Sequence, residues 1–130
     1  MDGRERENRV RGIRGATTVE ADVPEQILSA TRELLEEMLA QNGISEYSEI
    51  SSVFFTTTPD LSSTFPAEGA RALGMTMVPL LCFQEIPVPN RLPRCVRVML
   101  LLNTTKAQDE MRHVYLREAR SLRPDLVSAQ

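Results

Sequence analysis

The pattern of apolar and polar positions predicts a chain in which strands and helices are interleaved. Residues 10–19, 50–57, 77–83 and 94–103 are rich in β-branched, aromatic or alternating apolar residues and are bounded by turn-forming residues, which is typical of strands. Pro79 lies inside the third segment. Because proline has no N–H to donate to a neighbouring strand, we expect that strand at an edge or a bulge of the sheet.

Two other segments carry the helical period. In residues 24–43, apolar side chains recur at spacings of three and four, a proline opens the first turn, and an Asn-Gly pair ends the segment. Residues 66–73 predict a shorter helix. Residues 106–122 are ambiguous, although their propensities favour helix. This order of elements predicts an α/β (α+β) fold with a mixed sheet of about five strands, one long helix and one short helix, the helices on one side.

The last predicted strand holds a charge on an apolar face. Valine and leucine occupy the even positions from 96 to 102, and they alternate with Cys95, Arg97, Met99 and Leu101. Arg97 therefore shares one face with three apolar side chains. An unpaired charge is costly in such a place, so we expect a carboxylate partner or a bound anion against the guanidinium group.

Composition bounds the class of protein. With 130 residues, 42% of them hydrophobic, we expect one folded domain over residues 9–124, a disordered tail at 1–8 and a mobile tail at 125–130. A net charge of −3 argues against a nucleic-acid partner. No apolar run approaches the roughly 20 residues of a membrane helix, and no signal peptide is apparent. Two cysteines suit a reducing cytoplasm, and one histidine is too few for a typical zinc site.

Six motifs carry the candidate chemistry. They are Arg11-Gly-Ile-Arg-Gly-Ala-Thr-Thr18, Thr58-Pro-Asp-Leu61 with Phe65-Pro-Ala67, Cys82-Phe-Gln-Glu85, Cys95-Val-Arg-Val98, Arg112-His-Val-Tyr-Leu116 and Leu122-Arg-Pro-Asp-Leu126. An arginine side chain offers five N–H donors in a rigid fork that matches a carboxylate. In this company, we expect Arg14, Arg71, Arg97 and Arg123 to converge on one small dianion.

Together these motifs resemble, from about Arg11 to Leu126, the monofunctional chorismate mutases of the trimeric α/β-barrel class, as distinct from the all-helical class. The resemblance implies a homotrimer whose sheets pack as a pseudo-barrel with an active site in each subunit cleft. It implies strand, rather than helix, for residues 114–122. It also implies an isomerase of aromatic amino acid biosynthesis (the shikimate pathway) that rearranges chorismate to prephenate. This Claisen [3,3] shift transfers no proton and implies no cofactor and no metal.

The resemblance also implies residue roles. Arg97 donates to the ether oxygen and to a substrate carboxylate, while Glu85 accepts from the ring hydroxyl and faces the developing cation. Arg14 and Tyr115 hold the enolpyruvyl carboxylate, and Cys82 lies beside the ring hydroxyl. The further substrate-binding positions that it implies are Phe65, Ala67, Arg71, Leu81, Leu122 and Arg123. Two residues depart from the family pattern, which has lysine in place of Glu68 and a small polar residue in place of Leu81.

Two other functions stay open at this point. An enamine or imine deaminase-like hydrolase of related fold also uses an arginine at a subunit cleft, but it needs a positioned water. A non-catalytic trimer that binds small anions would bind the same ligand without turnover. Taken singly, most of the candidate residues are more simply surface charges or core side chains. Arg97 is evenly balanced between a buried ion pair and a ligand contact, and His113 is interpreted as structural. The joint arrangement of these residues favours the mutase.

Overall fold

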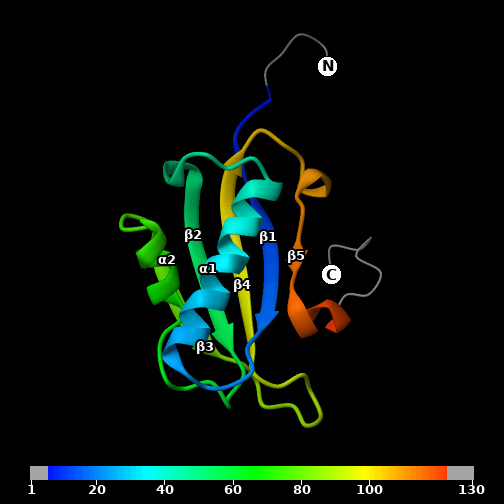
Figure 1. The fold of residues 1–130 in the computed structure, drawn as a ribbon. Helices are drawn as coiled ribbons and strands as arrows, with labels where there is room; N and C mark the ends of the chain where they lie inside the picture. The colour runs from blue at the N-terminus through cyan, green and yellow to red at the C-terminus, as the bar shows by residue number, and fades with distance from the viewer. Residues whose placement is uncertain (1–5, 123–130) are drawn as a thin grey trace.

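A mixed five-stranded sheet organises the chain in the computed structural model, which describes residues 6–122 (Figure 1). The strand order is β3-β2-β4-β1-β5. The strands are β1 (Arg9–Thr18), β2 (Ile50–Thr57), β3 (Leu80–Gln84), β4 (Cys95–Thr104) and β5 (Val114–Tyr115). β4 runs antiparallel to β1 and β2, while β3 and β5 run parallel to β2 and β1. The predicted mixed sheet is confirmed.

The two α-helices of the described chain lie on one face of this sheet (Figure 1). α1 (Pro24–Gln41) begins with its proline in the first turn and ends at Asn42, as the sequence predicts. α2 (Ala67–Leu73) packs beside it. At Gly15 in β1, a Cβ atom would lie 2.4 Å from the Met38 sulfur, so this glycine allows α1 to approach the sheet closely. Neither helix, nor any other in residues 6–122, is long and apolar enough to cross a membrane.

The two faces of the sheet differ in burial. The face under the helices carries the core, which includes Ile13, Val53, Phe55, Val98 and Leu100. The residues that alternate with them point to the opposite face of the sheet. No helix of residues 6–122 covers this face in the way that α1 and α2 cover the first, and we call it the open face. Large apolar side chains on this open face, such as Phe83 and Leu81, are 50% and 55% exposed. Arg97 lies on the open face, as the alternation in β4 predicts.

β3 forms an edge of the sheet, as Pro79 predicts. The strand begins one residue after this proline, and not at Met77, which is 90% exposed. The carbonyl of Pro79 accepts a hydrogen bond from the N–H of Val53 at 3.0 Å. Pro79 therefore joins β2 through its carbonyl, a contact that needs no N–H.

The expectation that residues 114–122 form a strand is wrong for most of the segment. β5 comprises only Val114 and Tyr115, and a 3₁₀ helix, η3 (Arg117–Leu122), follows. Arg117 has a positive φ of 54°, which turns the backbone away from the sheet after one further hydrogen bond from Leu116 N–H to the Ala16 carbonyl. Ala119 is then buried within η3. The helical propensity of this segment prevails over extended pairing.

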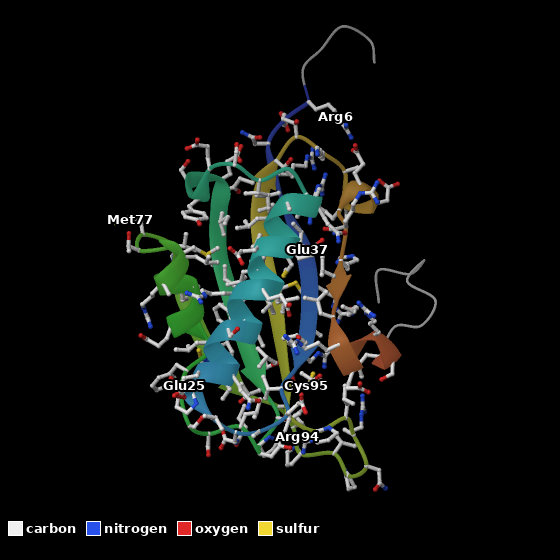
Figure 2. All side chains as sticks on the ribbon, viewed as in Figure 1. Arg6, Glu25, Glu37, Met77, Arg94 and Cys95 are labelled. Atoms are coloured by element: carbon white, nitrogen blue, oxygen red, sulfur yellow. The ribbon has the colours of Figure 1, made fainter. Side chains whose placement is uncertain are left out.

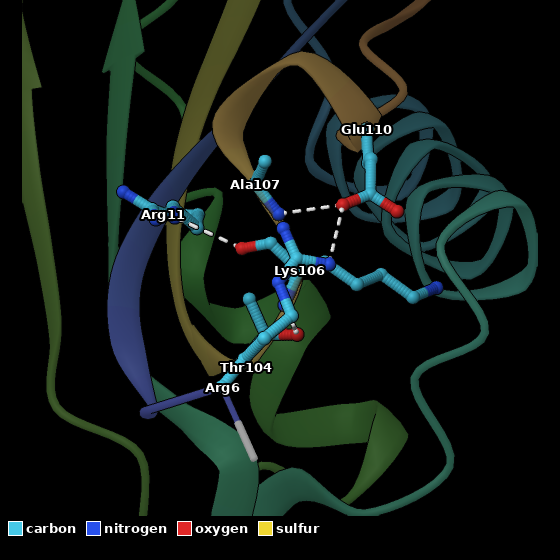
Figure 3. Close-up of polar contacts among 6 residues, drawn as sticks. All are labelled: Arg6, Arg11, Thr104, Lys106, Ala107 and Glu110. Carbon is cyan, nitrogen blue, oxygen red and sulfur yellow. Dashed lines mark hydrogen bonds and ion pairs between the residues drawn. The ribbon is translucent and has the colours of Figure 1, made fainter. Parts of the chain in front are cut away.

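Polar contacts fix the connection from β4 to β5 (Figure 3). Arg11 donates to the Lys106 carbonyl at 3.0 Å, and Glu110 accepts from the Ala107 N–H at 2.7 Å. Arg6 also donates to Glu110, at 3.3 Å, and belongs to the segment expected to be a tail. These contacts lie at the far end of the sheet from Cys95 and Arg94 (Figure 2). They hold the returning chain beside β1, where β5 forms.

Candidate active site

A cavity of about 240 Å³ opens where β3 ends and β4 begins. Its wall consists of the loop between these strands, the start of β4 and the end of η3. The lining residues are Thr58, Glu85, Ile86, Val88, Arg91, Leu92, Cys95, Arg97 and Leu122. The structure thus brings together three of the residues singled out from the sequence, Glu85, Arg97 and Leu122.

Strand pairing positions the two charged residues of this cavity. Arg97 in β4 lies directly opposite Thr56 in β2. Glu85 follows the last residue of β3, and its N–H donates to the Thr57 carbonyl at 2.8 Å, which extends the pairing of β3 with β2 by one residue. Backbone hydrogen bonds therefore set the positions of both side chains on the open face.

The two charges contact each other. Arg97 Nη1 lies 3.5 Å from Glu85 Oε1, and the Thr56 hydroxyl donates to the other carboxylate oxygen, Oε2. The Arg97 side chain is 41% exposed and the Glu85 side chain 23%. Glu85 is thus the carboxylate partner expected for Arg97. The pair is partly withdrawn from water, which strengthens its field at the cavity.

The Thr58-Pro-Asp turn fixes the start of β4. Thr58 and Cys95 exchange two hydrogen bonds, from Thr58 N–H to the Cys95 carbonyl at 3.0 Å and from Cys95 N–H to the Thr58 hydroxyl at 2.9 Å. The Asp60 carboxylate accepts from the Arg94 N–H at 3.0 and 3.1 Å. Arg97 follows two residues after Cys95, so this turn sets where the guanidinium group emerges.

Tyr115 and Arg14 belong to the same open face. Arg97 lies opposite Ala16 in β1, and Ala16 lies opposite Tyr115 in β5. The small side chain of Ala16 leaves space between the larger two, whose backbones are roughly 10 Å apart at normal strand spacing. Arg14 is half-buried, and its backbone N–H donates to His113 Nδ1 at 2.9 Å. This bond supports the structural interpretation of His113.

Cys95 forms part of the cavity wall but is closed to solvent. It packs with Ala16, Tyr115 and Ala119 in a small apolar cluster, against which Leu122 also lies. Burial raises the pKa of its thiol to about 11, although the Arg97 guanidinium opposes this shift. The thiol therefore stays protonated at neutral pH and contributes an apolar surface.

A second group of candidate residues gathers around α2, on the helix side of the sheet. Cys82 packs against the main core there, and burial raises the pKa of its thiol, with the Ala67 N–H and the Arg71 charge opposing. Arg71 forms an ion pair with Glu68 one turn away on α2. Phe65 just precedes α2 and is 67% exposed.

The two groups do not meet within one chain. Consecutive strand residues point to opposite faces, so Leu81 lies on the open face while Cys82 lies under the helices. Arg123 lies outside the described residues.

Sequence reasoning missed Thr56 and four cavity-lining residues of the loop after β3: Ile86, Val88, Arg91 and Leu92. Thr56 belongs to a run of three threonines, and only strand register distinguishes which of them faces the site. The loop has no periodic pattern, and its three prolines indicated only a turn-rich connection. A signal was available for Arg91, because it adds a cation between two strand ends that both carry candidate residues.

Comparison with known proteins adds family information. The family model for chorismate mutase type I matches residues 10–126. The chain is 63% identical to the chorismate mutase AroH of Thermus thermophilus over 93% of this chain and 99% of that protein. It is 45% identical to AroH of Bacillus subtilis over 90% and 92%. A solved chorismate mutase from Clostridium thermocellum superposes with a TM-score of 0.83 at 44% identity, covering 85% of this chain and 97% of that one. The chain therefore belongs to the chorismate mutase type I family.

Proposed function

We propose that this protein is a chorismate mutase, an isomerase of aromatic amino acid biosynthesis, and that Arg97 and Glu85 carry its catalysis. The observation that carries the proposal is the pairing of these two opposite charges on one cavity wall, 3.5 Å apart. In the rearrangement of chorismate to prephenate, the ether C–O bond breaks ahead of C–C bond formation. Negative charge then gathers on the ether oxygen while positive charge spreads over the ring.

Arg97 supplies the positive charge that stabilises the ether oxygen as it becomes negative. Its guanidinium group carries five N–H donors, and the contact with Glu85 leaves others able to bind the substrate. Its place on an interior strand of the sheet means that little reorganisation is needed when charge develops. A donor fixed in this way stabilises the transition state more than the ground state, so it acts on kcat.

Glu85 supplies the negative charge that stabilises the ring as it becomes positive. Its carboxylate accepts from the ring hydroxyl and faces the carbon atoms that become positive. Tyr115 and Arg14, on the same open face, hold the enolpyruvyl carboxylate. Holding the substrate in a compact conformer supplies a further part of the rate acceleration. The chain's own residues provide every charge that this mechanism requires.

A homotrimer with active sites in the subunit clefts is part of the proposal. Two observations support it. The candidate residues fall into two groups on opposite sides of one sheet, so a complete set would need two copies of the chain. The open face also exposes large apolar side chains, including Leu81 and Phe83, which another copy would cover. We infer a cytoplasmic location for the assembly.

The other two functions are less well supported. A deaminase-like hydrolase would need a positioned water, and family membership does not favour it. A binding-only trimer would have no use for an acid placed against its anion-binding arginine, because Glu85 weakens the hold of Arg97 on a carboxylate ligand.

Loss of chorismate absorbance, with prephenate measured as product, tests the function. We expect rapid turnover by purified protein in buffer containing a chelator, and strongly reduced turnover by Glu85→Ala. Thermal unfolding of both proteins provides the folding control. A folded wild-type protein without turnover would contradict the proposed function, and sedimentation or light scattering that finds a monomer would contradict the trimer.

A further inference from the structure

Thr56 contacts the candidate catalytic pair although no motif drew attention to it. Its hydroxyl donates to Glu85 Oε2, while the other oxygen of that carboxylate faces Arg97 at 3.5 Å. Thr56 lies opposite Arg97 in β4 and opposite Phe83 in β3, two residues before Glu85. Three adjacent strands therefore bring one hydroxyl, one carboxylate and one guanidinium group together on the open face.

The hydroxyl limits how Glu85 and Arg97 can pair. A carboxylate and a guanidinium group left to themselves favour a bidentate contact with two parallel hydrogen bonds. Such a contact would occupy two of the Arg97 donors and turn the carboxylate away from a substrate ring. In the structure, Thr56 binds Oε2 and Arg97 contacts only Oε1, so the observed pairing is through a single carboxylate oxygen.

The neighbouring threonines bond differently. Thr57 points to the helix side of the sheet, and its hydroxyl approaches the Leu61 carbonyl at 3.4 Å. The Thr58 hydroxyl accepts from the Cys95 N–H and donates to Asp60, contacts that stabilise the turn. Of the three, only Thr56 directs its hydroxyl to a carboxylate on the cavity wall. Its β-branched side chain on the interior strand β2 has few rotamers, which suits it to holding another group in place.

We propose that Thr56 is a positioning residue for the rearrangement, whose hydroxyl holds the Glu85 carboxylate toward the substrate and prevents it from closing onto Arg97. This inference rests on the proposed chorismate mutase function. Thr56 itself need not touch the substrate. It acts by orienting Glu85. The orientation of Glu85 in turn determines how many N–H donors of Arg97 stay available to bind the substrate anion.

Three substitutions test the inference. Thr56→Val keeps the shape and removes the hydroxyl, Thr56→Ser restores the hydroxyl, and Thr17→Val makes the same chemical change on the helix side, where the hydroxyl has no hydrogen-bond partner. We expect Thr56→Val to lower kcat about ten- to hundredfold, the range for losing a hydrogen bond to a charged group. Thr56→Ser and Thr17→Val are expected to stay within about threefold of wild type. Unfolding midpoints are measured on all three, and Thr56→Ala replaces Thr56→Val if the valine variant fails to fold.

A double-mutant cycle separates positioning from a general effect on the strand. If Thr56 acts through Glu85, Thr56→Val adds less than about a twofold loss in a Glu85→Ala background. Prephenate accumulation at high enzyme concentration measures the residual turnover. The same loss in both backgrounds, or a wild-type kcat in folded Thr56→Val, would overturn the inference. Absence of turnover in wild type and Thr17→Val would instead overturn the proposed function.

Discussion

The charged residues on the open face and those on α2 are held in very different ways. Arg97 lies in β4 and Glu85 follows the end of β3, and hydrogen bonds to β2, the strand between them, position both residues. Arg71 and Glu68 lie one turn apart on a seven-residue helix, with side chains 51% and 48% exposed. Exposed ion pairs of this kind contribute little because water screens them. We therefore expect the rigid, partly buried pair to distinguish a transition state from a substrate, and the α2 charges to affect the binding of both alike.

Replacing Arg97 is the strongest test of this difference between the open face and α2. We expect Arg97→Ala to lower kcat by about 10³-fold or more, because a preorganised donor to a developing oxyanion is lost. Arg97→Lys keeps the charge without the fork and is expected to lose less. Steady-state kinetics with chorismate measures both, and a near-normal kcat for folded Arg97→Ala would remove this arginine from its central role.

Mixing a variant that loses kcat with one that binds chorismate weakly tests how the two regions are arranged in space. If each site takes its open-face group from one copy and its α2 group from another, Arg97→Ala and Arg71→Glu chains refolded together form some intact sites. Random assembly of equal amounts gives about one intact site in four. We expect activity at low chorismate to rise well above that of either variant alone. Recovery no greater than the mean of the two would mean that both groups serve a site within one chain, or that one group serves none.

Substitutions on α2 are expected to act on KM. Arg71→Ala is expected to raise KM several-fold with kcat within about twofold, because an exposed cation binds substrate and transition state alike. Glu68→Lys makes the opposite change, since it removes the carboxylate that pairs with Arg71 and adds a cation, so it is expected to lower KM. Increasing salt reduces both effects through screening. A large loss of kcat in Arg71→Ala would contradict the division of roles.

The sequence predicts the elements of this fold well where periodicity is strong. The helix from Pro24, the strand at 50–57 and the alternation that directs Arg97 away from the core are all present. Residues 114–122 were predicted incorrectly, because a two-residue strand and the positive φ of Arg117 depend on tertiary contacts. Propensity alone was closer to the observed structure there than the family resemblance.

The site was only partly predictable for a different reason. Side chains that meet across strands, such as Thr56 and Glu85, are 29 residues apart in the chain, and only register brings them together. Motifs identified the charged residues one by one. They did not indicate that Cys82 and Arg97 would fall on opposite sides of the sheet. That division follows from alternation along β3 and β4, and it is what the mixing experiment tests.

The two cysteines extend the comparison to stability, with the smallest expected effect. Cys95 beside Arg97 is 2% exposed, whereas Cys82 near α2 is half-buried. Burial raises the pKa of the Cys95 thiol from an ordinary value of 9.0 to about 11. Below pH 9 the folded and unfolded chains both keep this proton, so it adds no pH dependence. Between pH 9 and 11 the unfolded chain loses the proton first, and the free energy of unfolding falls by on the order of 2 kcal/mol.

Urea unfolding of wild type and Cys95→Ala at several pH values isolates this contribution, because the two proteins differ only at position 95. The alanine variant has a lower stability at pH 8 from the lost packing. We expect the difference between the two proteins to narrow from pH 9 to 11. A constant difference would mean that water reaches the Cys95 thiol. The cavity wall beside Arg97 would then be as accessible to water as the surface of α2. The two regions would no longer differ in how far they exclude water, which is the main physical distinction between them.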